Sequence, residues 1–385
     1  DYCKYTKIHK RRSFFIQRNL CNKHFPNYVS LFCITIYNDY IGGPPPIFRK
    51  LRINMKIGTV ANKTDVKGYS REVCIIGVGC TPFLNTLDHE ETNGLTEGEM
   101  DGYAALKAME DAGIEPKDVQ FYFHGQANPL FSSKYMTPNM QVANWFGMKG
   151  KGSVHHSEAC CTGYLALEQA VNAVAGGKFD CVLTGCVEFG DGVVVDQHQP
   201  QFRRRHFPMD DFFESTEWLI DNAYSREMVA PKGVCFDDTA VTYMRRYGLT
   251  EDQVDDALIG MALENRTNAM LNEKAHVRIS YEEEAKKSGY DDVWEYMRSN
   301  HNSKVGDIQR HSGIETKSDG AAAVIVASVE WAREHKLAHT PINVLAIGTA
   351  AWELATPHVE TKGSEEATRQ AYAMCDVKPE DIGLV

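Results

Sequence analysis

The sequence contains no apolar stretch that approaches the roughly 20 residues needed to cross a membrane as a helix. It also has no pair of cysteines spaced as Cys-x-x-Cys, the spacing typical of structural zinc sites. Eleven cysteines in 385 residues are too few for the dense disulfide framework of a small secreted domain. These absences argue against a membrane span, a zinc module and a secreted disulfide scaffold. They predict a cytoplasmic protein with reduced thiols.

Residues 1–54 lack methionine and are poor in acidic side chains. They hold ten Lys and Arg against two Asp and Glu, a net charge of +8. A basic leader of this kind suits an organelle transit peptide, although no amphipathic period is sustained along it. Translated sequence upstream of a start at Met55 is the interpretation that we favour. We therefore expect residues 1–54 to be a disordered or non-native leader.

The rest of the chain is strongly acidic, since it must carry a net charge of −19 to bring the total to −11. Nucleic acids and anionic membrane surfaces attract basic proteins, so neither is expected as a partner. The 43% hydrophobic and 24% charged content is that of a globular protein.

From residue 72 the hydrophobic pattern alternates between strand-like and helix-like segments. "EVCIIGVGCTPF" (72–83) reads as a buried strand, and "TEGEMDGYAALKAMEDAGI" (96–114) has helical spacing that closes at Gly113. Further segments continue the alternation: strands at 117–125, 152–159 and 179–191, and helices at 137–148 and 162–175. This alternation predicts an α/β layered fold around a central sheet.

Two distant segments resemble each other. "ALKAMEDAGIEPKDV" (105–119) and "TRQAYAMCDVKPEDI" (368–382) superpose at a constant offset of 263, and each follows a strand-like segment rich in small residues. The repetition predicts two similar halves. The first copy continues for more than 150 residues, whereas the sequence ends soon after the second. We therefore expect the second half to be incomplete.

A cysteine pair lies where a helix is about to begin, in "HSEACCTGYLALEQAVNAVAGG" (156–177). A thiol at a helix start feels unpaired N–H groups and the positive end of the helix dipole, and both favour the thiolate. A sharp turn from strand to helix also presents a nucleophile clear of the sheet. We expect Thr162 to cap the helix. Buried structural thiols and a redox-active vicinal pair remain alternatives at this point.

Other pairs of polar residues suggest metal sites less strongly. His155 and His156 are neighbours on a predicted strand, so alternation places them on opposite faces of the sheet. The pairs at 210–211 and 237–238 are both Asp-Asp, but no His or Glu completes a ligand set. We predict no metal site.

Four motifs in order resemble the thiolase family, in particular the branch related to sterol-carrier-protein thiolases. In that branch a Cys-x-Ser-Gly turn opens a central helix and a later strand ends in Gly-x-Glu, as "CCTG" (160–163) and "GCVE" (185–188) do here. "YMRRYGLTEDQV" (243–254) with "ENRTNAMLN" (264–272), and "SDGAAAVIVAS" (318–328), match two further family segments. The resemblance covers about residues 72–385. One type in this branch cleaves aromatic substrates such as benzoylsuccinyl-CoA.

The resemblance implies a thiolase-like duplicated α-β-α-β-α layered fold. Residues 55–330 would form the N-terminal half, with a loop domain inserted at about 195–300, and residues 331–385 would begin the second half. It also implies a homodimer, and it allows a small zinc-ribbon/OB-fold partner subunit.

The resemblance implies that Cys160 is the nucleophile of a Claisen reaction that cleaves or forms a 3-oxoacyl-CoA. Cys161 then takes a position usually held by a small packing residue. Coenzyme A would be a substrate, and no permanently bound cofactor is implied. The family's two histidine motifs belong to its second half, and none of the 14 histidines here matches them, so we assign no catalytic base.

The only tight basic run in the acidic body is Arg203, Arg204 and Arg205. It falls where the family's loop domain holds the CoA nucleotide, so these arginines are candidates for phosphate binding; a solvated basic surface is the alternative. Two other functions stay open for the whole chain: a non-catalytic acyl-CoA-binding subunit or scaffold, and the redox protein.

Overall fold

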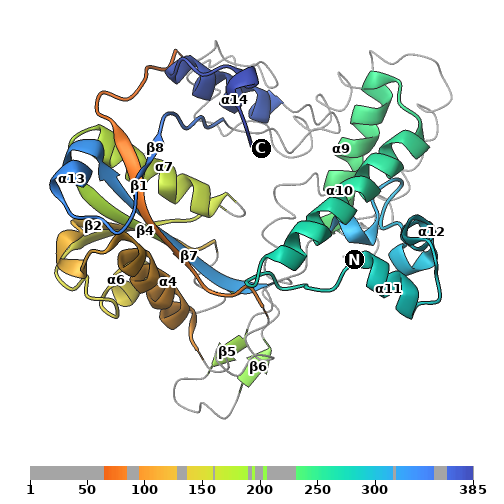
Figure 1. Cartoon of the computed structure of the whole chain (residues 1–385), viewed down its shortest axis with the longest axis horizontal. Coiled ribbons are helices and arrows are strands. Elements are labelled where there is room, and N and C mark those ends of the chain that lie inside the picture. Colours follow the sequence, from red (N-terminus) through yellow and green to blue (C-terminus); the bar gives the residue numbers. More distant parts are fainter. Residues whose placement is uncertain are drawn as a thin grey trace, which may run out of the picture. The chain divides into compact units, whose positions relative to one another are not determined.

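The main sheet of the structure, a computed structural model, is mixed and has six strands in the order β3-β2-β4-β7-β1-β8 (Figure 1). The chain divides into two units, residues 1–63 and 64–385, and all described residues lie in the second. The structure describes residues 65–84, 95–127, 137–158, 161–189, 193–195, 203–205, 231–314, 318–350 and 362–384.

The strands of this sheet are β1 (Val73–Cys80), β2 (Phe121–Gly125), β3 (Gly152–His156), β4 (Cys181–Phe189), β7 (Asp319–Ser328) and β8 (Ile342–Val344). Strand β2 pairs in parallel with both β3 and β4, whereas β7 is antiparallel to its neighbours β4 and β1. Strand β8 pairs antiparallel with the outer side of β1. The carboxyl ends of β2, β3 and β4 therefore meet at one edge of the sheet.

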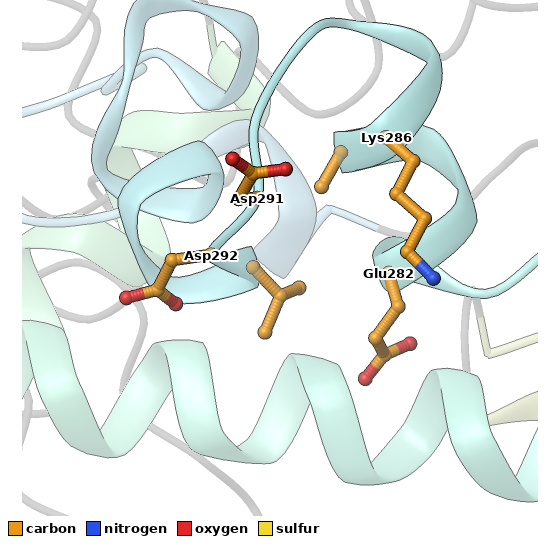
Figure 2. Close-up of a pocket in the computed structure, with 6 residues that line it drawn as sticks. Glu282, Lys286, Asp291 and Asp292 are labelled. Carbon is orange, nitrogen blue, oxygen red and sulfur yellow. The ribbon is translucent and has the colours of Figure 1, made fainter.

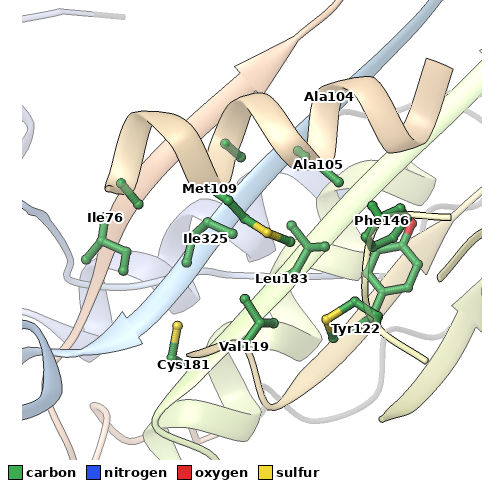
Figure 3. Close-up of a cluster of buried hydrophobic side chains, with 14 of the residues drawn as sticks. Ile76, Ala104, Ala105, Met109, Val119, Tyr122, Phe146, Cys181, Leu183 and Ile325 are labelled. Atoms are coloured by element: carbon green, nitrogen blue, oxygen red, sulfur yellow. The ribbon is translucent and has the colours of Figure 1, made fainter. Parts of the chain in front are cut away.

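Helix α4 (Glu97–Ala112) covers one face of this sheet, where it packs on β1, β7 and β4. Thr96 and Glu99 form a capping box that fixes its start, and Gly113 ends it with a left-handed backbone conformation (φ 74°). The buried side chains on this face form one apolar cluster (Figure 3). Its labelled members are Ile76, Ala104, Ala105, Met109, Val119, Tyr122, Phe146, Cys181, Leu183 and Ile325.

Helix α7 (Thr162–Ala175) covers the opposite face and has the bounds predicted from the sequence. Each central strand supplies alternate residues to the two faces. Tyr122, Leu183 and Ile325 pack under α4, whereas their chain neighbours Phe123, Val182 and Val326 pack under α7. Because both faces are buried, the strands read as nearly continuous apolar runs. Two further helices, α6 (Pro138–Ala143) and α13 (Val329–Glu334), are short.

The repeated segments adopt the same local structure. Helix α14 (Lys362–Met374) and the turn η4 (Pro379–Asp381) repeat α4 and η1 (Pro116–Asp118). In each turn an aspartate accepts a hydrogen bond from the backbone N–H three residues earlier, at 2.9 Å for Asp118 and 3.0 Å for Asp381. The offset seen in the sequence therefore corresponds to a repeated helix and turn.

A close approach between strand and helix is repeated as well. A Cβ added to Gly79 would lie 2.3 Å from the carbonyl oxygen of Ala104 in α4. A Cβ added to Gly348, which follows β8, would lie 1.9 Å from the carbonyl oxygen of Ala367 in α14. Ala104 and Ala367 are separated by the same 263 positions as the repeated segments. Only glycine fits at either contact.

Residues 231–314 are mainly helical. Their helices are α9 (Pro231–Tyr247), α10 (Glu251–Leu271), α11 (Tyr281–Lys287) and α12 (Val293–Arg298), with the turns η2 (Asn300–Asn302) and η3 (His311–Gly313). Asp237 accepts hydrogen bonds from three successive backbone N–H groups, 307–309, at 2.7–2.9 Å. Asp237 therefore fixes the backbone of the loop at 307–309. The other Asp-Asp pair, at 210–211, lies outside the described residues.

A separate two-stranded sheet pairs β5 (Val193–Val195) with β6 (Arg203–Arg205). The three candidate arginines therefore form a strand; their phosphate-binding role stays a prediction. The predicted leader at 1–54 lies outside the described residues. Within the part of the chain that the structure describes, no helix has the length and apolar character to span a membrane.

Candidate active site

The candidate site lies at the edge where the parallel strands end and α7 begins. Gly125 at the end of β2 is in register with His156 of β3 and with Cys186 of β4. Helix α7 starts six residues after β3 ends. In open α/β sheets the carboxyl ends of parallel strands are where ligands bind, because the loops there converge with helix N-termini. The predicted nucleophile region thus falls at the chemically favoured edge of this sheet.

The turn into α7 is held by its own backbone. The N–H of Cys161 donates to the carbonyl oxygen of Glu158 at 3.0 Å, and the N–H of Glu158 donates to Oγ1 of Thr162 at 2.8 Å. Cys161 is the N-cap residue, and its side chain makes no capping hydrogen bond. The prediction that Thr162 caps the helix was therefore wrong: its hydroxyl points back and closes the turn instead.

Of the two adjacent cysteines, the structure describes only the second. Cys160 lies outside the described residues, so its role as nucleophile stays a prediction. Cys161 is exposed, which contradicts the packing role expected for it. Cys161 precedes the first turn of α7 and belongs to neither of the apolar clusters on the two faces of the sheet. The redox alternative concerns the same pair and is not tested by the described residues.

A third thiol lies beneath the start of α7. A Cβ added to Gly125 would lie 2.4 Å from Sγ of Cys186 and 3.1 Å from Cγ2 of Thr162, so the three residues are tightly packed. Burial raises the pKa of the Cys186 thiol to about 12, and the nearby Asp101 carboxylate adds to the shift. Cys186 is therefore a neutral packing group.

Four buried polar side chains form a network beside this thiol. The hydroxyl of Tyr122 donates a short hydrogen bond to Oδ2 of Asp101, and its oxygen lies 2.7 Å from Nδ1 of His124. Nε2 of His124 faces Oε1 of Gln126 at 3.4 Å. All four side chains are at most 2% exposed. Burial and the adjacent carboxylate raise the pKa of Tyr122 well above its usual value, so the phenol stays protonated.

Glu188, the last residue of the "GCVE" motif, carries a shifted carboxyl group. Burial raises its pKa to about 7, although the N–H of Ala127 donates to Oε2 at 2.7 Å and partly offsets the shift. A carboxyl group with this pKa at the edge of a sheet is able to hold or release a proton near neutral pH.

His155 and His156 lie on opposite faces of β3, as alternation predicted. The ring of His155 lies 5.6 Å from that of His124, on the α4 face, and that of His156 stacks with Phe123, on the α7 face. Burial lowers the pKa of both imidazoles. No group of three or more potential metal ligands occurs among the described residues.

The sequence interpretation missed the network of Asp101, Tyr122 and His124. One signal was present: in "FYFHG" (121–125) the alternate residues Tyr122 and His124 place two polar groups on one face of a buried strand. Asp101 occupies a helix position flanked by buried Met100 and Gly102, which is also unusual for a carboxylate.

A shallow depression of about 400 Å³ lies elsewhere, between α11 and α12 (Figure 2). It is lined by Glu282, Ala285, Lys286, Asp291, Asp292 and Val293. These residues come from the helical segment and include no member of the strand-edge site. The depression has no convergent apolar lining, so we do not assign the site to it.

Comparison with known proteins shows which proteins this chain is similar to. It is 28% identical to the acetyl-CoA acetyltransferase of Methanothermobacter thermautotrophicus over 82% of this chain and 73% of that protein. It is 29% identical to the acetyl-CoA acetyltransferase of Methanocaldococcus jannaschii over 82% and 71%. Sterol carrier protein 2 of Gallus gallus is 24% identical, and the match spans about half (53%) of that protein. No family model matches the chain.

Solved structures show the same fold. The acetyl-CoA acetyltransferase of Syntrophomonas wolfei superposes with a TM-score of 0.55 at 18% identity, over 81% of this chain and 77% of that one. Human mitochondrial 3-ketoacyl-CoA thiolase superposes with a TM-score of 0.52 at 15% identity, over 80% and 77%. The Ltp2-ChsH2(DUF35) aldolase gives 0.55 at 22% identity, over 81% and 72%. These matches confirm the predicted resemblance to thiolases and the predicted fold class.

Proposed function

We propose, on the premise that this chain has the thiolase fold, that it is a thiolase-type acyl-CoA C-acyltransferase with Cys160 as its covalent nucleophile. The observation that carries the proposal is the position of Cys161, the residue that follows Cys160 in the chain. Cys161 is the N-cap of α7, at the edge of the sheet where β2, β3 and β4 end. The names of the acetyl-CoA acetyltransferases to which the chain is similar support the same chemistry.

In the cleavage direction, the thiolate of Cys160 attacks the 3-keto carbon of a 3-oxoacyl-CoA. The bond between the 2- and 3-carbons breaks, its electron pair stays on the shorter CoA thioester as an enolate, and that enolate takes up a proton. The acyl group remains on sulfur as a thioester, and the thiol of free CoA then accepts it. The reverse sequence forms the carbon–carbon bond.

The start of α7 supplies what the first step needs. Its first-turn N–H groups donate no hydrogen bond to the side chain of the N-cap residue. Such groups, with the positive end of the helix dipole, stabilise a thiolate and the oxyanion that forms on attack. Coenzyme A acts as substrate, and the reaction needs no permanently bound cofactor.

The finer parts of the proposal concern substrate and partners. We propose that Arg203, Arg204 and Arg205 bind the phosphates of CoA, that an aromatic acyl group is a candidate substrate, and that the protein acts as a cytoplasmic homodimer. The two-part name of the Ltp2-ChsH2(DUF35) aldolase supports including a small partner subunit in the proposal.

The test is to trap the acyl group. The protein is incubated with acetoacetyl-CoA, quenched in acid, digested and analysed by mass spectrometry. We expect an acetyl group on Cys160, no acyl-enzyme in Cys160→Ala, and wild-type labelling in Cys161→Ala. Because Cys161 is exposed, Cys161→Ala should also change the free energy of unfolding by no more than about 0.5 kcal/mol.

Acylation of Cys161, or acylation that persists in Cys160→Ala, would contradict the assignment. The scaffold alternative predicts that acyl-CoA binds, as seen by calorimetry, while no cysteine is acylated with any 3-oxoacyl-CoA tested. The redox alternative predicts that two thiols are lost together on mild oxidation and regained on reduction.

A further inference from the structure

The network of Asp101, Tyr122 and His124 has a proton arrangement that its geometry dictates. The hydroxyl of Tyr122 has a single proton and donates it to Asp101, so its oxygen must accept from Nδ1–H of His124. On the other side of the ring, Nε2 faces the carbonyl oxygen Oε1 of Gln126, which is an acceptor. Both ring nitrogens of His124 therefore face acceptors and are placed to donate hydrogen bonds.

This arrangement of donors accounts for a buried acidic side chain beneath α4. Asp101 and His124 are both fully buried, and Nδ1 of His124 lies 3.4 Å from Oδ2 of Asp101. A buried carboxylate without a compensating charge is strongly unfavourable, whereas a hydrogen-bonded pair of opposite charges is tolerated. The titratable groups nearest the pair are His155, whose ring lies 5.6 Å from that of His124, together with Glu188 and Cys186. Burying the pair costs stability that a role in the site would have to justify.

The network is joined by hydrogen bonds to the strand ends beside the cysteine turn. Gln126 receives a hydrogen bond on its carbonyl oxygen from Nε2 of His155 at 2.9 Å and donates its N–H to the carbonyl of His156 at 3.2 Å. The next residue, Ala127, accepts from the hydroxyl of Ser157 at 2.7 Å and donates to Glu188. The residues that follow β3 are thus tied to those that follow β2.

The connection continues into α7. Glu158, one residue beyond Ser157, is bonded through its N–H to Thr162 and through its carbonyl oxygen to the N–H of Cys161. Each of these bonds fixes the position of the next backbone segment. A shift of Gln126 would therefore be transmitted to the residue that begins the helix.

We propose that Asp101, Tyr122 and His124 are positioning residues for the acyl transfer. They form a buried hydrogen-bonded triad that fixes Gln126 and Ala127, and through them the segment from Ser157 to the start of α7 at Cys161. The triad touches no substrate, and it acts by holding the nucleophile's turn. The proposal rests on the proposed function for the reaction it serves, but the hydrogen-bond donors of the His124 ring are independent of that function.

The first experiment tests whether both ring nitrogens of His124 donate. The protein is labelled with ¹⁵N-histidine, and His124→Asn identifies the resonances of His124. We expect both ring nitrogens of His124 to show the shifts of protonated nitrogens at pH 7.5. A neutral ring with one unprotonated nitrogen would overturn the triad, whether or not the protein transfers acyl groups.

The second experiment separates positioning from packing. Tyr122→Phe removes only the hydroxyl group. The double variant Asp101→Asn/His124→Asn replaces both titratable side chains together, so neither variant leaves one of them buried without the other. Rates are expressed per thiol titrated at the site, which corrects for misfolded protein. We expect Tyr122→Phe to lower kcat about tenfold while KM for the acyl-CoA stays within about twofold, because misplacing a nucleophile affects the chemical step. The double variant should show the same changes in kcat and KM as Tyr122→Phe.

Phe146→Leu is the matched control. Phe146 is buried in the same layer and its ring meets that of Tyr122 edge-on at 5.2 Å, but it has no polar atom. It should lower stability and leave kcat per titrated thiol within about twofold. Equal losses in Phe146→Leu and Tyr122→Phe, or no loss in Tyr122→Phe, would contradict the proposal.

The alkylation rate of exposed Cys161 by iodoacetamide gives a readout that needs no turnover. If the triad fixes the turn, Tyr122→Phe should change that rate at least threefold and Phe146→Leu should not; unchanged rates in both variants would contradict the proposal. A protein in which no cysteine is ever acylated would instead refute the proposed function, and leave the histidine resonances and this rate to decide on the triad.

Discussion

The thiols of the candidate site show how position, rather than residue type, sets reactivity. Cys161 at the helix start is exposed, whereas Cys186, beneath the same helix start, has a pKa raised to about 12 by burial. Only ionised thiols are nucleophiles, so Cys186 is chemically silent near neutral pH. Alkylation of the native protein should therefore label Cys161 and leave Cys186 unreacted.

Glu188 gives a prediction on pH dependence. Its pKa is raised from 4.5 to about 7 in the folded protein, so between these values the folded state binds a proton that the unfolded state has lost. The stabilisation is fully present below pH 4.5 and is lost as the pH rises through 7, and its size is on the order of 3 kcal/mol. Glu188→Gln keeps an oxygen that accepts from the N–H of Ala127 but cannot ionise.

Urea unfolding at pH 5 and pH 8 measures this effect. The variant should resemble the wild-type protein at pH 5 and be more stable than it at pH 8. A difference between the two proteins that does not change with pH would show that the Glu188 carboxyl group is not the source.

At the scale of the element, the close contact of strand and helix is the feature most sensitive to substitution. Gly79→Ala should destabilise the protein by about 1–3 kcal/mol, because its Cβ would meet a backbone carbonyl oxygen of α4 that cannot move alone. Gly348→Ala should behave similarly against α14. Gly260→Ala, in α10, is the control: its Cβ meets no atom within 4 Å, so it should stabilise by about 0.5–1 kcal/mol. Chemical denaturation of the three variants provides the comparison.

The bounds of the elements were predictable where the sequence carries a physical signal for them. α4 begins at a capping box and ends at a glycine, and both signals are local. The hydrophobic stretch 137–148 was predicted to be helical throughout, but the helix stops at Ala143 and turns follow. Strand pairing depends on contacts between distant segments, so "SDGAAAVIVAS" (318–328) carries no local signal that β7 inserts between β4 and β1. The buried triad escaped prediction because it depends on that same long-range assembly.

At the scale of the whole molecule, the division of the chain after residue 63 gives a further prediction. If residues 1–54 are a leader that the fold does not need, a chain that begins at Met55 should have a melting temperature within about 2 °C of the longer chain. Differential scanning calorimetry of both proteins makes the comparison. A larger decrease on removing residues 1–54 would show that the segment stabilises the rest.

The place of β7 in the sheet governs the order in which the protein can assemble. Among the described strands, β1 is joined to β2, β3 and β4 only through β7, and β7 is synthesised about 240 residues after β1. Until then β1 and β4 each have an unpaired edge. Contacts of such large sequence separation make folding slow, and exposed edges during that delay favour aggregation. A ribosome-bound chain that stops before residue 319 should therefore need a chaperone, whereas one extended beyond residue 328 has the strand that closes the gap.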